Sequence, residues 1–271
     1  MDDLQKRRLR LVAANTAALL LTAGIQPLIK PAAFDAGAGG ILNKYAGLFL
    51  SIPLDLSFWI AAYTVAAVFC IYSLIPVVWS NADRGMFIDR IGPLFIISCA
   101  MNLAWAFAWH FGWLPVSSGL ITLSFGLQIA VYVRLKIGAS RTNRLEKYFV
   151  HAPFSLFLGW ISLAAILNIT AHATYLNLDG IALNPQVPAV AWLFLVFALA
   201  IFMLVKRADI FFSLTTGWAL LQVFIKSASL EPASYHYMTL AAGMGMVMVL
   251  GAVIYMIIAG QVNRGPVHRL A

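Results

Sequence analysis

Charged residues are scarce in this chain. They make up 10% of its 271 residues, whereas hydrophobic residues make up 62%. A soluble domain carries about a quarter charged residues, so the composition excludes an ordinary soluble globular protein. It favours a polytopic α-helical membrane protein, because a helix satisfies its own backbone hydrogen bonds in lipid.

Cysteines and recognisable catalytic motifs are also few or missing. The two cysteines, Cys70 and Cys99, both lie inside apolar segments, which argues against a disulfide framework and favours small core residues. The sequence has no H-E-x-x-H motif, no glycine-rich phosphate loop and no paired carboxylates. His110, His151 and His172 are too dispersed to predict a metal cluster. The residues alone therefore do not indicate catalysis.

Long apolar segments are abundant, and a membrane span needs about 20 such residues. Eight segments qualify: residues 9–29, 52–79, 92–113, 115–135, 149–173, 187–205, 208–228 and 236–260. The basic start KRRLR followed by an apolar run resembles a signal sequence, but the run is long and no cleavage site follows. We expect a retained first helix and an all-α bundle of about eight transmembrane spans.

The distribution of lysine and arginine predicts the orientation of this bundle. If the N-terminus is cytoplasmic, the cytoplasmic connections carry 15 of the 18 basic residues. The other side then holds Lys30, Lys44 and Lys226. This asymmetry predicts a multi-pass membrane protein with both termini in the cytoplasm, and we expect its membrane to be the bacterial inner membrane, as the resemblance described below implies. It also explains the net charge of +8 without a nucleic-acid partner.

Polar and aromatic residues recur at helical spacing inside two of the predicted spans. Asn102, Trp105 and Trp109 stand at i, i+3 and i+7 in the third span. The fifth span carries a similar stripe of four residues: Phe157, Trp160, Ala164 and Asn168. An amide in hydrocarbon costs several kcal/mol unless it is hydrogen-bonded. Two such stripes could line a pocket for a flat apolar ligand, on which indole rings stack.

Each of these residues also has a purely structural interpretation. Trp109, near the outer boundary, could be an interfacial anchor. Asn102 and Asn168 could bond each other or a backbone carbonyl and so join two helices.

Three ionisable residues near the outer side leave further alternatives open. Asp55 could bond nearby backbone at the start of its span, or form part of a gate. His110 and His172 share one side of the predicted membrane, so they could be axial ligands of heme or chlorophyll.

Two motifs resemble the TspO/MBR family, the tryptophan-rich sensory proteins related to the peripheral benzodiazepine receptor. Asn102-Leu-Ala-Trp105 is similar to the third-helix pattern of that family. Pro153 followed by W-x-x-x-A-x-x-x-N, here Trp160 to Asn168, is similar to its fifth-helix pattern. The segment PFSLFLGWIS resembles the longer bacterial relatives, which add about three helices. Trp59 and Tyr63 keep a spacing of the second helix, but SIPLDLSF replaces the usual Pro-x-Gly opening.

The resemblance implies a five-helix ligand-binding core at residues 1–175 and three additional helices at residues 176–271. It further implies a pocket capped by the first loop, residues 30–50. Family members bind tetrapyrroles such as heme and protoporphyrin, and sterols. The candidates carried over for ligand binding are Trp59, Asn102, Trp105, Trp160, Ala164 and Asn168.

The sequence thus predicts a membrane sensor or carrier for a planar hydrophobic ligand, such as a porphyrin, heme or a sterol-like lipid. One alternative is a membrane enzyme acting on a tetrapyrrole or lipid, with Asp55 or His110 as proton donor. Another is an accessory subunit of a pigment–protein complex. The expected partners are the lipid bilayer, a hydrophobic small molecule, and a second copy of the chain or a membrane complex.

Overall fold

The computed structural model describes residues 3–29, 56–78, 85–140, 142–176, 186–229 and 232–260, and all of their secondary structure is helical. The long helices are α1 (Asp3–Ile25), α4 (Leu56–Val78), α6 (Leu94–His110), α7 (Leu114–Arg134), α9 (Ala152–Tyr175), α10 (Gln186–Arg207), α11 (Ile210–Ser229) and α12 (Pro232–Ile258). Short helical segments are η1 (Gln26–Leu28), α5 (Met86–Ile91), α8 (Arg144–Glu146) and the π-helical turn η3 (Lys147–His151).

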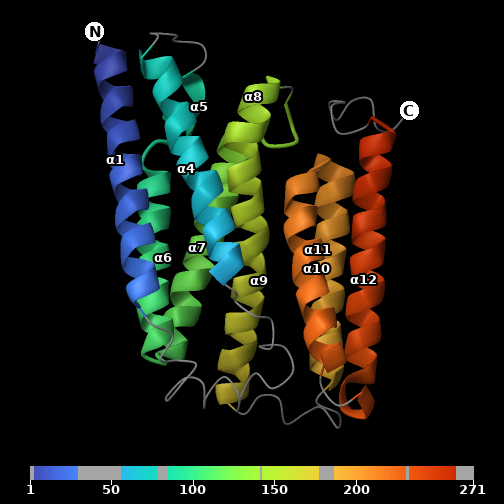
Figure 1. Cartoon of the computed structure of the whole chain (residues 1–271). Helices are drawn as coiled ribbons and strands as arrows, with labels where there is room; N and C mark the ends of the chain where they lie inside the picture. The colour runs from blue at the N-terminus through green and yellow to red at the C-terminus, as the bar shows by residue number, and fades with distance from the viewer. Residues whose placement is uncertain are drawn as a thin grey trace.

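The long helices match the eight predicted spans, with ends that differ by a few residues. Six of them are long and apolar enough to cross a membrane, and α6 and α11 are shorter apolar helices. The helices run alternately up and down, and α1 begins at the same end of the bundle at which α12 ends (Figure 1). Within the described residues, the prediction of an all-α transmembrane bundle is confirmed.

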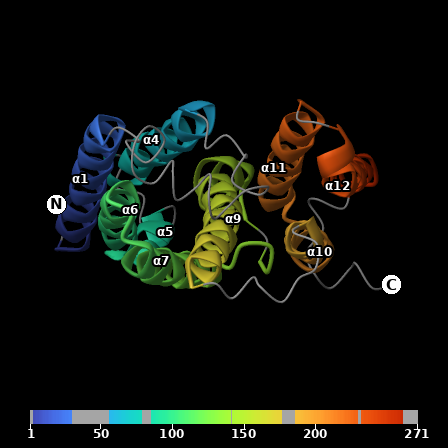
Figure 2. The same cartoon turned by 90° about the horizontal axis from the view of Figure 1, so that it is seen from below.

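The first five long helices, α1, α4, α6, α7 and α9, surround one hydrophobic core. Helix α9 lies between this group and the C-terminal helices (Figures 1 and 2). Its most apolar segment is 72% buried, against 28% for α1, α4, α10 and α12. Helix α9 is therefore enclosed on nearly all sides, whereas the other four leave most of their apolar surface to lipid. Both cysteines are buried and unpaired, as expected of core residues.

Helices α10, α11 and α12 pack around a second core, to which Leu163 and Leu167 of α9 also contribute. Helix α11 supplies their main contact with α9 (Figure 2). Gly159 of α9 permits this contact. A Cβ atom there would lie 3.1 Å from Cβ of Thr215 and 3.2 Å from the carbonyl oxygen of Phe212. The Thr215 hydroxyl donates to the carbonyl of Leu156 at 3.3 Å.

A buried carboxylate also joins the two helix groups. Ala208 and Asp209 form the turn between α10 and α11, and the Asp209 side chain is 4% exposed. Its Oδ2 atom accepts hydrogen bonds from the hydroxyls of Tyr132, at 2.8 Å, and Ser155. Its Oδ1 atom accepts from the backbone N–H of Phe212 at 3.1 Å. Burial raises the pKa of the Asp209 carboxyl above its usual range.

An ion pair closes the same end of the core. Arg8 of α1, 5% exposed, lies with one guanidinium nitrogen 2.6 Å from Oδ2 of Asp89 in α5, and its Nε donates to the same oxygen at 2.8 Å. A buried charge of this kind needs its partner, because an uncompensated one costs several kcal/mol. The pair therefore fixes the start of α1 against the segment that leads into α6.

Replacing Asp209 by Ala is expected to destabilise the protein by about 3 kcal/mol, because three buried donors lose their acceptor. Thermal unfolding followed by circular dichroism in detergent measures this. Ser140→Ala, at an exposed position, is the control and should leave the midpoint unchanged. Equal midpoints for the two variants would contradict the role assigned to Asp209.

The stabilising contribution of Asp209 should also depend on pH. Because its pKa is raised in the folded protein, the folded state binds the proton more tightly than the unfolded state does. Stability from this group is therefore fully present at low pH and is lost as pH rises through the raised pKa. The difference in unfolding midpoint between the wild type and Asp209→Asn should grow in favour of the wild type from neutral to mildly acidic pH. A pH-independent difference would contradict this prediction.

Candidate functional site

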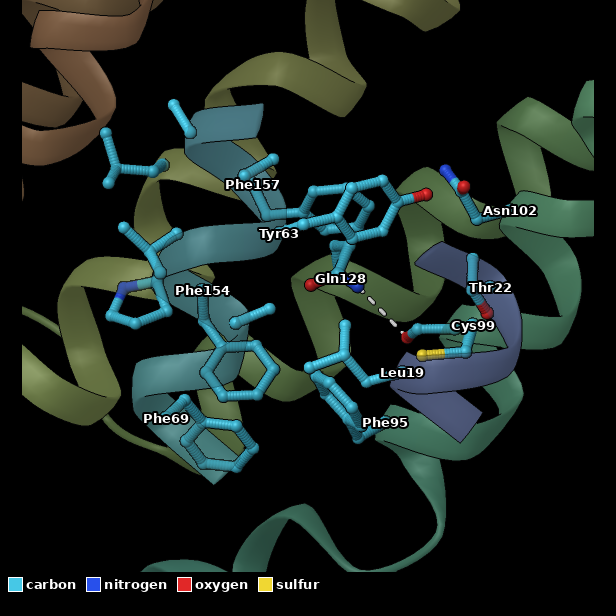
Figure 3. Close-up of a pocket in the computed structure, with 17 residues that line it drawn as sticks. Leu19, Thr22, Tyr63, Phe69, Phe95, Cys99, Asn102, Gln128, Phe154 and Phe157 are labelled. Atoms are coloured by element: carbon cyan, nitrogen blue, oxygen red, sulfur yellow. Dashed lines mark hydrogen bonds between the residues drawn. The ribbon is translucent and has the colours of Figure 1, made fainter. Parts of the chain in front are cut away.

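A cavity of about 130 Å³ lies inside the five-helix core (Figure 3). All five long helices of the core contribute to its wall. The lining residues are Leu19 and Thr22 of α1; Ala61, Ala62, Tyr63, Val65, Ala66 and Phe69 of α4; Phe95, Ser98, Cys99 and Asn102 of α6; Gln128 of α7; and Pro153, Phe154, Leu156 and Phe157 of α9.

Three phenylalanines from three helices form one end of the cavity. The ring centroid of Phe69 lies 5.3 Å from that of Phe95 and 5.1 Å from that of Phe154, and the latter two are 5.9 Å apart. Edge-on and tilted contacts at these distances are favourable for aromatic rings. This end of the cavity is therefore a fixed apolar wall, and Figure 3 shows the three rings grouped below Tyr63 and Phe157.

Two amides supply most of the polar character of the wall. The Nε2 atom of Gln128 donates to the Ser98 hydroxyl at 3.0 Å, and that hydroxyl donates to the Leu94 carbonyl at 2.8 Å. The Oε1 atom of Gln128 and the Nδ2 atom of Asn102 are buried without a hydrogen-bond partner. The two side chains are 2% and 6% exposed. An unpaired buried amide group costs about 1–3 kcal/mol, so each of these two atoms favours a hydrogen-bonding partner in the cavity.

The cavity is closed on one side and partly open on another. Its residues on α1, α6 and α7 are all buried. On α4, Ala61 is exposed and Val65 half-buried, and on α9, Leu156 and Phe157 are half-buried. The exposed and half-buried part of the lining therefore lies on α4 and α9.

The predicted stripe on α6 reaches this cavity with one of its three residues. Asn102 lines it, whereas Trp105 and Trp109 are buried outside the lining. The two indoles stack on each other, with centroids 6.1 Å apart and an angle of 26° between the rings. Trp109 is 8% exposed, so within the structure it is a core residue and not an anchor at the surface.

The four residues of the predicted stripe on α9 have different surroundings. Phe157 lines the cavity, but Trp160 faces Trp218 of α11 at a centroid distance of 6.5 Å. Ala164 is buried in the core. The Oδ1 atom of Asn168 accepts hydrogen bonds from Ser117, at 2.8 Å, and Ser118, at 3.4 Å. Asn168 thus joins α9 to α7, and the two asparagines do not bond each other.

The remaining candidates lie outside the cavity or outside the described residues. His110 is half-buried and packs edge-on against Phe111 at 5.0 Å, and His172 lies 6.5 Å from the ring of Tyr175. Neither lines the cavity. Asp55 and the loop 30–50 lie outside the described residues, and so does the side chain of Trp59. No group of three potential metal ligands occurs in the part of the chain that the structure describes.

The tryptophan-containing stripes of the sequence did not indicate Gln128 or Ser98 as site residues, nor the role of Tyr63. Gln128 could have been predicted from the sequence, because it is a lone amide in an apolar segment. Like Asn102, it is costly in hydrocarbon unless it is hydrogen-bonded. Tyr63 donates a hydrogen bond to Gln26 at the end of α1, and so holds the wall of the cavity on α4 against α1.

The described lining does not fit a whole heme. Cys99 and Tyr63 belong to residue types that can ligate heme iron, but the lining holds no histidine, and no lysine or arginine to pair with propionates. The volume of about 130 Å³ is close to that of an engineered cavity of about 150 Å³ that admits benzene. The space corresponds to one or two rings and not to a complete tetrapyrrole.

The model of the family described as TSPO-like protein matches residues 12–255, which include both the five-helix core and the three C-terminal helices. No curated protein and no solved structure matches the chain.

Substituting leucine for each asparagine in turn tests the difference between their structural roles. Asn168→Leu is expected to lower stability by about 1–2 kcal/mol, because it removes the acceptor of two buried serines. Asn102→Leu, the matched control, should not lower stability, because its Nδ2 atom has no partner to lose. Thermal unfolding in detergent measures both. Equal losses in the two variants would contradict the difference in role.

Proposed function

The chain belongs to the TSPO-like protein family, and we propose that it is an integral membrane protein that binds a planar, largely apolar molecule as a sensor or carrier. The observation that supports this is the cavity of the five-helix core. It is lined by aromatic rings, carries two unpaired amide atoms, and opens along α4 and α9.

The position of the cavity opening determines the route by which such a ligand would enter. An apolar molecule concentrates in the bilayer and would enter sideways, past Ala61 and Val65 of α4. Moving from lipid into an apolar cavity gains little hydrophobic free energy, since lipid tails are as apolar as leucine. Selectivity must therefore come from the fit against the rings and from hydrogen bonds to the polar atoms.

The sequence left two ligand classes open, porphyrins including heme and sterol-like lipids. The size and the neutral lining of the cavity favour the sterol-like class. One terminal ring of such a molecule fits the space, and the rest of its body extends through the mouth into lipid. A tetrapyrrole would need the core to widen.

The alternative functions have less support in the geometry. As proton donor of an enzyme, His110 would have to reach the ligand, and it does not line the cavity. As structural residues of a pigment–protein complex, the tryptophans would merely pack. Trp105 and Trp160 do pack in this way, but that interpretation leaves the cavity and its two unpaired atoms without an explanation.

Filling the cavity should abolish binding. Ala66→Phe places a ring in the space between Tyr63 and Phe69 and is expected to reduce the affinity for a tritiated sterol by at least about tenfold. Thr64→Phe, two residues earlier on the exposed face of α4, is the matched control and should bind like the wild type. Equilibrium binding in nanodiscs provides the measurement. Equal affinities of Ala66→Phe and the wild type would place the ligand elsewhere.

A further inference from the structure

We propose that six basic side chains at one end of the bundle bind the phosphate head group of an anionic phospholipid. They come from three segments of the chain: Arg134 and Lys136 at and just after the end of α7, Arg144 and Lys147 in α8 and η3, and Lys206 and Arg207 at the end of α10. We call this group the basic junction. It lies at the end of the bundle at which α1 begins (Figure 1), and it is independent of the cavity and of any ligand there.

Contacts between the segments hold the basic junction together. Gly138, two residues after Lys136, packs on the end of α10. A Cβ atom added to Gly138 would overlap the carbonyl oxygen of Arg207 and lie 2.8 Å from its Cβ atom. The ring of Tyr148 in η3 lies edge-on to that of Phe211 at the start of α11, with centroids 5.9 Å apart. The three basic segments are therefore brought to one place by packing, although they are up to 73 residues apart in the sequence.

Two turns of the junction keep an unfavourable backbone conformation. Lys136 has a φ of 54° and Ala208 a φ of 47°, and among the described residues all others with a positive φ are glycines. This conformation is unfavourable for a residue with a side chain, and it persists where surrounding contacts hold it, often at binding sites. Here the hydroxyl of Tyr132, close to the first turn, donates to Asp209 in the second at 2.8 Å. The two turns are thus fixed relative to each other.

The positive charge of the junction has little acidic compensation. Its exposed members are Arg134, Lys136, Arg144 and Lys206. Within the described part of the chain, none of these four forms an ion pair with a carboxylate. The acidic side chains of the same segments have other neighbours: Glu146 lies 3.9 Å from Nε2 of His151, and Asp209 is buried among its three donors. A phosphate can therefore bind here without displacing an existing anion.

Exposed apolar side chains beside the basic ones favour a lipid over a free phosphate. Val133 precedes Arg134 and is 57% exposed, and Val205 precedes Lys206 and is 60% exposed. Tyr148, next to Lys147 in the chain, is 55% exposed. A phospholipid uses both kinds of surface, since its acyl chains cover the apolar residues while its head group meets the cations. Basic pockets between transmembrane helices bind anionic head groups in this way, and α7 and α10 lie on either side of α9 (Figure 2).

The test compares two variants that lose the same charge at the same end of the bundle. The junction variant carries Arg134→Gln, Lys136→Gln and Lys206→Gln. The α1 variant carries Lys6→Gln, Arg7→Gln and Arg10→Gln, at exposed residues outside the junction. Native mass spectrometry of the full-length protein in detergent measures the apparent Kd of the first bound lipid. The probes are phosphatidylglycerol and cardiolipin, which are anionic; phosphatidylcholine, which is zwitterionic; and glycerol phosphate, which has a phosphate without acyl chains.

The wild type should bind the two anionic lipids at least about tenfold more tightly than phosphatidylcholine, and glycerol phosphate should not displace them. The junction variant should lose at least about tenfold in affinity for the anionic lipids, because each basic residue near the head groups contributes about fivefold. The α1 variant should stay within about twofold of the wild type. Arg134→Gln and Lys206→Gln, made singly, should each weaken binding about threefold to fivefold, and they test the site even if the triple variant does not fold.

Three results would overturn the inference. Equal losses in the junction and α1 variants would mean that the charge acts over the whole end of the bundle. Equal affinity for phosphatidylcholine and phosphatidylglycerol would remove the role of charge. Displacement of the lipid by glycerol phosphate would make the ligand a free phosphate. Circular dichroism of each variant confirms the helical fold before binding is compared, and none of these results bears on the cavity, so the proposed function would stand.

Discussion

Every polar group that this chain places in hydrocarbon must find its partner within the protein, and this constraint accounts for many of the buried side-chain hydrogen bonds. The hydroxyls of Thr16, Thr22 and Ser73 donate to carbonyls one turn earlier in their own helices. Asn168 and Asp209 gather donors from neighbouring helices instead. Against this background, two unpaired amide atoms that line one cavity from different helices are a departure from the rule.

The positions of the helices could be predicted because the hydropathy of a segment is read directly from its own residues. All eight long helices match apolar segments of the sequence, including α4, which continues through Pro76 to Val78. The sixth and seventh apolar segments, 187–205 and 208–228, are separated by only two residues, and the structure accordingly has a short turn there, at Ala208 and Asp209. Its carboxylate was not expected to become a buried acceptor, because the sequence does not show that Tyr132 and Ser155 lie beside it.

The helical stripes were less informative about the site. Spacing shows which residues share a face, but not which neighbour that face meets. On a helix enclosed on nearly all sides, such as α9, one broad stripe meets the cavity at Phe157, α11 at Trp160 and α7 at Asn168. The two asparagines are the same residue type, and only the packing around them distinguishes a helix contact from a cavity wall. Gln128 was overlooked because it belongs to neither stripe.

One turn of α9 contributes both to the wall of the cavity and to the attachment of the C-terminal helices. Pro153, Phe154, Leu156 and Phe157 line the cavity, while Ser155, in the middle of the same turn, holds the carboxylate of the hairpin between α10 and α11. A helical turn moves as a unit, so widening the cavity at this wall also displaces the anchor of the last three helices. The hairpin between α10 and α11 is therefore attached to the same stretch of backbone that shapes one wall of the cavity.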